Sequence, residues 1–349
     1  MKIKTTFSLF LGILCLIHSC TKKEFEGPLI ETLYANFEFV DSLSITNKNP
    51  NFSSNEQVGF HCQFNKPVEW KITVLGLSSN ASRVITGFSS LIDSNNIFWN
   101  GGPSQIPFFI EEVCLVELTI VNEIDTLRDT INIVSAKNYE NGIWVESFEN
   151  GFPEDALDHY NTDGGGMTFF IANDDPLLGN SYYKMGGRVN WDWALGAIDL
   201  PLNISDVTQN SEELYVNIGI LSDLQDLHTG QFINILISEE TEVPFNDNLN
   251  NNASDLFEAN MEVYKIKIPV NWDGWQLKSF RYSDFEPISE NDPNINFNKN
   301  PSDIRAIRIS CQACPSSSGN PICPENFSKD VRTDIDHIIF TINSSLLDQ

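Results

Sequence analysis

The chain contains 349 residues and carries 21 basic against 48 acidic side chains, which gives a formal net charge of −27. An acidic chain without a basic stripe repels phosphate backbones, so composition excludes a nucleic-acid-binding protein. A chain of this length is expected to form two domains.

The first residues have the composition of a secretory signal. Lys2 and Lys4 precede an apolar run over residues 7–17, and Cys20 follows a small residue at its end. A charged start, a short apolar core and a small-residue exit are typical of a signal peptide, and the run is too short for a membrane-spanning helix. An ordinary cleaved signal with a chance cysteine and a lipoprotein signal both fit this pattern.

Residues 17–20, Ile-His-Ser-Cys, resemble the end of a bacterial lipoprotein signal. The resemblance implies that residues 1–19 are removed, that Cys20 is acylated, and that residues 20–32 form the tether of a surface-exposed lipoprotein of the Bacteroidetes type. It also implies attachment to the outer membrane through lipid chains, several of which together bind a bilayer firmly. Without the two lysines of the signal, the mature chain has 19 basic against 48 acidic residues and a net charge near −29.

Residues 33–136 alternate apolar and polar side chains with the period of β-strands. Two strand faces are evident: one is Val58, Phe60, Cys62 and Phe64, and the other is Cys114, Val116, Leu118 and Ile120. The segments 68–76 and 97–102 resemble the W-x-I-x-I-x-G and W-[DN]-G motifs of an immunoglobulin-like module found in many secreted bacterial proteins. The resemblance implies a small β-sandwich that acts as a spacer.

Two inward-facing cysteines flank the strand residue Trp70 in the sequence. In this respect Cys62 and Cys114 resemble the paired cysteines of immunoglobulin-like sandwiches. The resemblance implies an inter-sheet disulfide between them, which an oxidising compartment permits. Two buried free thiols are the alternative.

Turn-forming residues at 137–142 interrupt the strand pattern and are predicted to form a linker. Short strands resume from residue 143, separated by turns rich in Gly, Pro and Asn. This pattern predicts a second all-β sandwich over residues 143–349, of the jelly-roll type. The predicted fold class is therefore all-β, with an immunoglobulin-like sandwich followed by a jelly roll.

Residues 271–285 (NWDGWQLKSFRYSDF) resemble a signature of galactose-binding-like jelly rolls. That family includes carbohydrate-binding modules and surface glycan-binding lipoproteins of Bacteroidetes. Arg281 departs from its pattern, in which proline is common at this position. Further segments match other strands of the family in the expected order, namely 146–151, 179–187, 303–309 and 334–341. The resemblance implies a polysaccharide or oligosaccharide ligand, bound in a groove where aromatic rings stack on sugars.

Sugar rings have an apolar face and a rim of hydroxyl groups, so a sugar site needs flat aromatic rings together with amide or guanidinium groups. Trp191 and Trp193 share a strand face without an aliphatic residue between them, which favours a binding platform. A place for one of them in the core is equally open. The candidate ligand-binding residues are Trp191, Trp193, Tyr182, Arg188, Gln231, Asn234 and Arg305.

The same resemblance implies a structural calcium ion between the opening and closing strands of the jelly roll. By position, Glu149 and Asp336 are expected to supply carboxylates, with Asp175 or Asn173 nearby. Hard oxygen ligands of this kind suit calcium. Solvated turn carboxylates are the alternative.

Cys311, Cys314 and Cys323 lie in a stretch rich in Pro, Ser and Gly. A zinc site needs a fourth ligand, and no further cysteine or suitably spaced histidine follows. We therefore expect a loop disulfide, either Cys311–Cys323 or Cys314–Cys323, with one thiol left over.

These features predict a non-catalytic, lipid-anchored cell-surface protein that binds glycans through its second sandwich. One alternative is an adhesion or structural protein that binds a protein partner in an outer-membrane assembly. The other is a glycoside hydrolase, with Asp334 and Asp336 as two acids on one strand face. The sequence contains no G-x-S-x-G, HExxH or P-loop motif to support an enzyme.

Overall fold

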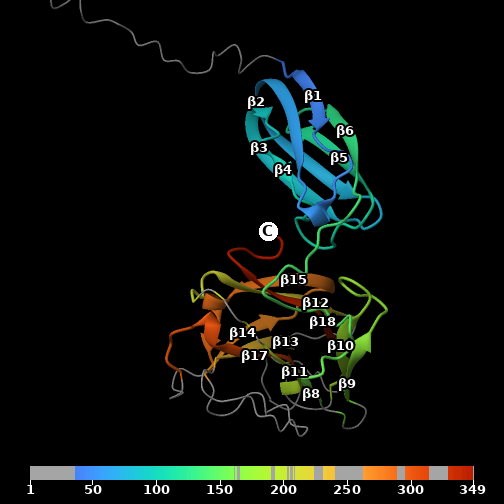
Figure 1. Cartoon of the computed structure of the whole chain (residues 1–349). Helices are drawn as coiled ribbons and strands as arrows, with labels where there is room; N and C mark the ends of the chain where they lie inside the picture. Colours follow the sequence, from blue (N-terminus) through green and yellow to red (C-terminus); the bar gives the residue numbers. More distant parts are fainter. Residues whose placement is uncertain are drawn as a thin grey trace, which may run out of the picture.

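Two β-sandwiches follow one another along the chain (Figure 1). The described elements are strands and short 3-10 turns (52–54, 282–284, 301–303), which confirms the predicted all-β class. Within the described ranges, no helix is long and apolar enough to cross a membrane. The computed structural model describes residues 36–160, 162, 166–189, 193–202, 204, 207, 209–223, 231–239, 262–288, 295–313 and 329–348.

The first sandwich is one antiparallel sheet wrapped around its core. It pairs in the order β1-β2-β5-β6, and β3 and β4 also pair with β2. The sheet closes because the segment after β1 meets the end of β6: Asn132 N donates to Lys48 O at 2.8 Å, and Val134 N donates to Pro50 O at 3.0 Å. Its strands are β1 (Phe39–Ile45), β2 (Val58–Gly76), β3 (Ser82–Ile92), β4 (Phe98–Trp99), β5 (Val113–Ile120) and β6 (Thr126–Asn132).

Alternating side chains of β2 and β5 build the core of this sandwich, and both strand faces predicted from the sequence are buried. Trp99 lies edge-on to Phe52 and Phe109, with ring centroids 4.7 and 4.8 Å away. Its Nε1 donates to Gly102 O at 2.8 Å, which satisfies the polar end of a buried indole.

Cys62 and Cys114 are free thiols, so the predicted disulfide between them is wrong. Both side chains are buried, as the alternation indicated. They lie at opposite ends of β2, however, because Cys62 is near its start whereas Cys114 pairs with its last residue, Gly76. Cys62 Sγ donates instead to Asp41 O at 3.1 Å, and burial raises the pKa of both thiols.

The second sandwich consists of two antiparallel sheets. One, called here the β18 sheet, has the order β15-β12-β18-β10-β9, and β7 pairs with the end of β18. Its strands are β7 (Trp144–Glu146), β9 (Met167–Ala172), β10 (Tyr182–Arg188), β12 (Leu214–Ser222), β15 (Gly274–Arg281) and β18 (Asp330–Ile342).

The other sheet, called the β17 sheet, has the order β16-β14-β13-β17-β11-β8. One apolar core lies between the two sheets, with alternate residues of β12 on one side and of β13 on the other. The strands of the β17 sheet are β8 (Leu157–Tyr160), β11 (Trp193–Pro201), β13 (Gln231–Glu239), β14 (Glu262–Pro269), β16 (Glu286–Pro287) and β17 (Ile304–Ala313).

Cys311 on β17 is a buried free thiol, and its Sγ lies 2.9 Å from Thr333 Oγ1. The predicted Cys311–Cys323 disulfide is therefore wrong, because Cys311 faces the core between the sheets. Cys314 and Cys323, the other predicted pair, lie outside the described residues.

Candidate functional site

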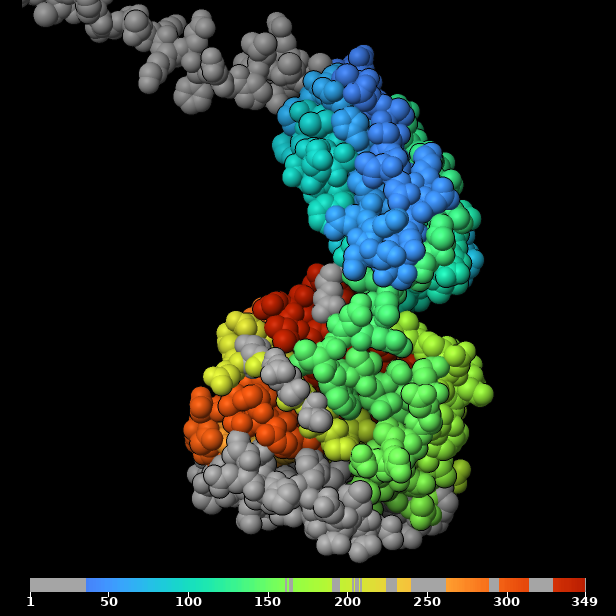
Figure 2. Space-filling model, viewed as in Figure 1, coloured from blue at the N-terminus to red at the C-terminus, as the bar shows by residue number. Residues whose placement is uncertain are grey.

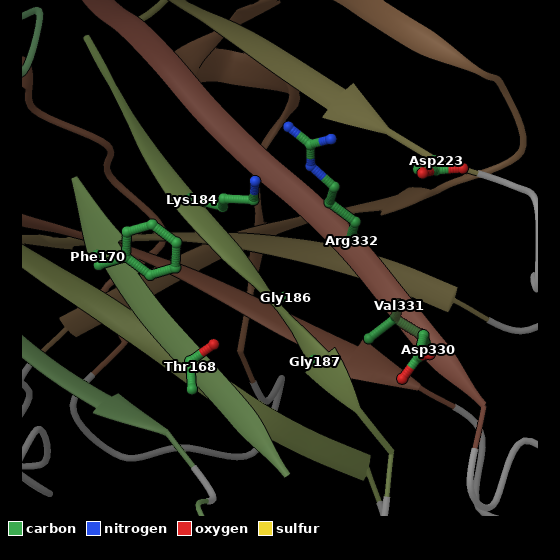
Figure 3. Close-up of a pocket in the computed structure, with 9 residues that line it drawn as sticks. All are labelled: Thr168, Phe170, Lys184, Gly186, Gly187, Asp223, Asp330, Val331 and Arg332. Atoms are coloured by element: carbon green, nitrogen blue, oxygen red, sulfur yellow. The ribbon is translucent and has the colours of Figure 1, made fainter. Parts of the chain in front are cut away.

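An open groove of about 360 Å³ lies on the outer face of the β18 sheet, over β9, β10 and the start of β18 (Figure 3). We call it the β9–β10 groove. It lies on the side of the sheet away from the core, and of its lining residues only Val331 is also a member of the core. It is lined by Thr168, Phe170, Lys184, Gly186, Gly187, Asp223, Asp330, Val331 and Arg332.

The floor of the groove is bare backbone at Gly186 and Gly187. By register, Gly186 lies between Thr168 on β9 and Arg332 on β18. A Cβ at Gly187 would lie 2.4 Å from the carbonyl oxygen of Gly166, and its φ of +138° also disfavours any other residue. The glycines therefore keep the groove open between two flanking rows of side chains.

Phe170 forms the apolar wall of the groove. Its side chain stands out from β9 and is 49% exposed, although its sequence neighbours Phe169 and Ile171 pack on the core. Lys184, its partner on β10, places Nζ 5.8 Å from the ring centroid. The pair offers an exposed aromatic face beside a hydrogen-bond donor.

Arg332 is held in place by hydrogen bonds to the buried residues Asp334 and Tyr182. Its Nε donates to Asp334 Oδ2 at 2.5 Å, and its Nη2 donates to Tyr182 Oη at 2.8 Å. Tyr182 in turn donates to Asp174. Burial raises the pKa of Asp334 to about 6, and the positive charge of Arg332 opposes that rise. A guanidinium fixed in this way is preorganised to bind a polar ligand.

Further charged side chains border the groove. Lys184 Nζ lies 3.3 Å from Asp174, and Arg188 Nε lies 3.7 Å from Asp330. Figure 3 shows Lys184, Arg332 and Asp223 on one side of the two glycines and Asp330 further along β18. The groove therefore combines one aromatic ring with both donors and acceptors for hydrogen bonds.

The sequence-predicted binding residues are divided between the two sheets. Arg188 borders the groove through its ion pair with Asp330. Tyr182 lies on the same sheet but is fully buried, so its ring has no free face for a sugar and the prediction of a direct contact is corrected. Its ring meets Trp275 edge-on at 5.6 Å, and its hydroxyl supports Arg332.

Gln231, Asn234 and Arg305 lie on the β17 sheet, away from the groove. Gln231 is 2% exposed, and its side-chain oxygen and nitrogen both lack hydrogen-bond partners within the described part of the chain. Asn234 Nδ2 donates to Gln312 Oε1 at 2.9 Å. Arg305 Nη1 donates to two backbone carbonyls within the turn that precedes β17, which is a structural role.

The predicted tryptophan platform stays a prediction. The backbone of Trp193 begins β11 and pairs with Ala313. Trp191 lies outside the described residues, as does the side chain of Trp193.

Glu149 and Asp336, two of the predicted calcium ligands, converge on one loop. Asp336 Oδ2 accepts from the backbone N–H groups of Leu177 and Leu178 at 2.9 and 3.1 Å. Glu149 Oε1 accepts in the same way from Asn180 N at 2.7 Å. These N–H groups occupy the carboxylate oxygens that a cation would need as ligands.

One observation at this loop does fit a cation. Asp336 Oδ1 is buried and has no hydrogen-bond partner among the described residues, and burial raises the pKa of this carboxyl to about 7. The third predicted ligand, Asp175, accepts Trp275 Nε1 on its backbone oxygen at 2.8 Å. The described residues contain no cluster of three or more His, Cys, Asp or Glu side chains suited to a metal. Calcium binding stays a prediction.

The sequence reasoning missed Phe170 and the Gly186–Gly187 pair. A signal for Phe170 was present, because Thr168 and Phe170 have the opposite parity to the core-facing Met167 and Phe169. The glycine floor had no comparable signal, since its position beside β9 and β18 depends on strand register.

No protein-family model matches the sequence, and no curated relative matches it. Among solved structures, a tandem of CBM22 domains from Paenibacillus barcinonensis Xyn10C is 9% identical, covering 88% of this chain and 93% of that chain with a TM-score of 0.32. SGBP-B from a xyloglucan utilization locus of Bacteroides uniformis is 13% identical, covering 86% and 72%, with a TM-score of 0.32. A family 30 carbohydrate-binding module is 12% identical, covering 60% and 92%, with a TM-score of 0.33. All three TM-scores lie below 0.5, so none of these structures shows the family of this chain.

Proposed function

We propose that this protein binds glycans without catalysis, through the β9–β10 groove, and that a lipid on Cys20 anchors it to the outer membrane at the cell surface. The observation that supports the groove is Phe170, an aromatic side chain 49% exposed on a sheet face beside a glycine floor. An exposed ring alone is common on a protein surface, and what supports binding here is the ring together with charged side chains around one open groove.

The chemistry of the groove suits a sugar ring. Phe170 offers a flat apolar surface to the C–H face of a pyranose. Lys184 and Arg332 can donate hydrogen bonds to hydroxyl oxygens, and Asp223 or Asp330 can accept from hydroxyl groups. Hydrogen bonds that involve a charged partner are stronger than neutral ones, so a few of them can orient a ring stacked on phenylalanine.

Affinity electrophoresis of the mature chain tests this assignment, with gels that contain xylan, xyloglucan, galactomannan or polygalacturonate. We expect at least one polymer to retard the wild-type protein and Phe170→Ala to abolish the retardation. Phe88→Ala is the matched control, because Phe88 is 73% exposed on β3 of the other sandwich. Equal retardation of Phe170→Ala and wild type would contradict the assignment to this groove.

A second variant separates the groove from the platform predicted at Trp191 and Trp193. If the double substitution to alanine abolishes retardation and Phe170→Ala does not, the sugar binds at the tryptophans instead. Release of reducing sugar from a retarding polymer would contradict the non-catalytic part of the proposal. Incorporation of labelled palmitate into the wild type but not into Cys20→Ser tests the lipid anchor.

A further inference from the structure

A small apolar cluster joins the two sandwiches, and we call it the junction cluster. Its buried members are Phe108, from the loop between β4 and β5, Tyr139 of the linker, Ile339 of β18 and Leu346 near the C-terminus. All four are at most 5% exposed. The rings of Phe108 and Tyr139 lie 4.2 Å apart between centroids, so a side chain of the first sandwich packs directly on the linker.

Hydrogen bonds hold the chain just before the linker and within it. On the first sandwich, Phe52 N donates to Ser135 O at 2.9 Å. On the second, Nε2 of the buried His337 lies 2.9 Å from the carbonyl oxygen of Tyr139, which accepts a hydrogen bond from it. Three residues, 136–138, therefore lie between the two hydrogen-bonded positions, and little of the chain is left to pivot.

The C-terminal segment contributes Leu346 to the junction cluster and is held there by hydrogen bonds to the second sandwich. Leu346 N donates to Asn217 Oδ1 at 2.9 Å, and Ser279 Oγ donates to the same oxygen at 2.7 Å. Asn217 is itself buried and bonds through Nδ2 to Ile339 O at 3.1 Å. Figure 2 shows the red C-terminal segment and the green linker meeting where the first sandwich rests on the second.

We propose that the two sandwiches form one rigid body, in which the junction cluster fixes the direction of the β9–β10 groove relative to the first sandwich. Relative motion is the default for two domains of one chain unless their interface is large and apolar. The junction cluster is small, but it buries Phe108 of the first sandwich against Tyr139, which is hydrogen-bonded to the second sandwich, so motion between the sandwiches would expose Phe108 to water.

The groove then lies at the end of the second sandwich remote from the junction cluster. β18 contributes Val331 to the groove and Ile339 to the junction cluster. Eight residues of strand separate these positions, which is about 26 Å at ~3.3 Å per residue. In Figure 1, β1, where the described chain begins, starts at the far end of the first sandwich. The rigidity does not depend on a glycan ligand. Its role in orienting the groove toward a glycan rests on the proposed function.

Hydrogen exchange and solution X-ray scattering of the mature chain with Cys20→Ser test the proposal. In wild type we expect amides of residues 136–142 to exchange at least tenfold more slowly than in an unfolded peptide, and scattering to fit a single conformation. Phe108→Ser should make the amides of the linker exchange fast and should increase the maximum dimension of the molecule measured by scattering. The amides of β2 and β18 should still exchange slowly. Ile110→Ser is the control, because Ile110 is exposed in the same loop and lies outside the cluster.

Leu346→Ser disrupts the junction cluster on the side of the second sandwich, so it should have the same effect as Phe108→Ser. It keeps the test decisive if Phe108→Ser fails to fold. Fast linker exchange in the wild type, or scattering that requires a broad set of domain orientations, would overturn the proposal. Neither readout involves a sugar, so failure here leaves the glycan assignment standing, and failure of glycan binding leaves the rigid junction standing.

Discussion

Two glutamates face one another at the end of the β13–β14 pair, and the removal of one charge there should stabilise the protein. Glu239 and Glu262 are direct partners in the antiparallel register and are 4% and 8% exposed. Glu239 Oε1 accepts from Tyr282 Oη at 2.6 Å and from Asn300 N at 2.8 Å. Burial raises the pKa of Glu239 from 4.5 to about 7; these two hydrogen bonds oppose the rise, and the charge of Glu262 reinforces it.

The sign of the pH dependence follows from this raised pKa. The folded chain holds the proton of Glu239 more tightly than the unfolded chain does, so the contribution of Glu239 to stability is complete below pH 4.5 and is lost as the pH rises through 7. A difference of roughly 2.5 pKa units corresponds to about 3 kcal/mol in the free energy of unfolding. Glu239→Gln keeps an oxygen for Tyr282 and Asn300 but carries no charge. We therefore expect it to exceed wild type by up to about 3 kcal/mol at pH 8 and to equal it near pH 5.

Urea unfolding of both proteins at pH 5, 6.5 and 8, followed by circular dichroism, measures this difference. Glu112→Gln is the matched control in the first sandwich. Burial alone would raise the pKa of Glu112, but hydrogen bonds from Ser79, Ser78 and Ile110 outweigh it and lower the pKa. This variant should lose stability at pH 8. If Glu239→Gln gains nothing over wild type between pH 5 and 8, Glu239 carries its charge in the fold without penalty and the reasoning is refuted.

Two further predictions concern the cysteines and calcium. Because Cys62 and Cys114 are buried free thiols with pKa values raised to about 11 and about 12, we expect no reaction with a thiol reagent until the chain unfolds. With Cys314 and Cys323 replaced by serine, dithiothreitol should then leave Tm unchanged; a fall in Tm equivalent to ~4 kcal/mol would reveal a disulfide between Cys62 and Cys114. If calcium binds beside the unpartnered Asp336 Oδ1, a concentration of one hundred times Kd should stabilise the wild type by about 2.7 kcal/mol and Asp336→Ala should abolish the effect. A Tm that changes with neither calcium nor chelator would contradict calcium binding.

The alternation of apolar residues was sufficient to predict two all-β units and the strand faces of the first core. Val58, Phe60, Cys62 and Phe64 are buried as that pattern requires, because a strand directs every second side chain to one face. The same rule explains the failure of the disulfide prediction. Alternation places Cys62 and Cys114 inside, but it does not give their distance along β2.

The outer faces of the second sandwich depended on tertiary structure for a different reason. Tyr182 and Phe170 both point away from the core, yet Tyr182 is buried by the network of Arg332 and Asp174 whereas Phe170 is half exposed. A local pattern cannot distinguish them, because the covering residue Arg332 is 150 positions away in the chain.

The groove and the junction cluster both depend on contacts between residues far apart in the chain. Gly186 faces Arg332 only through the register of β10 with β18, and Phe108 meets Tyr139 only because the linker folds back on the first sandwich. The sequence by itself determined which segments become strands and which of their faces are apolar, since both follow from short-range periodicity. The tertiary structure decided which outward-facing side chains gather around bare backbone and which are covered, because strand register and domain packing bring together residues distant in the chain.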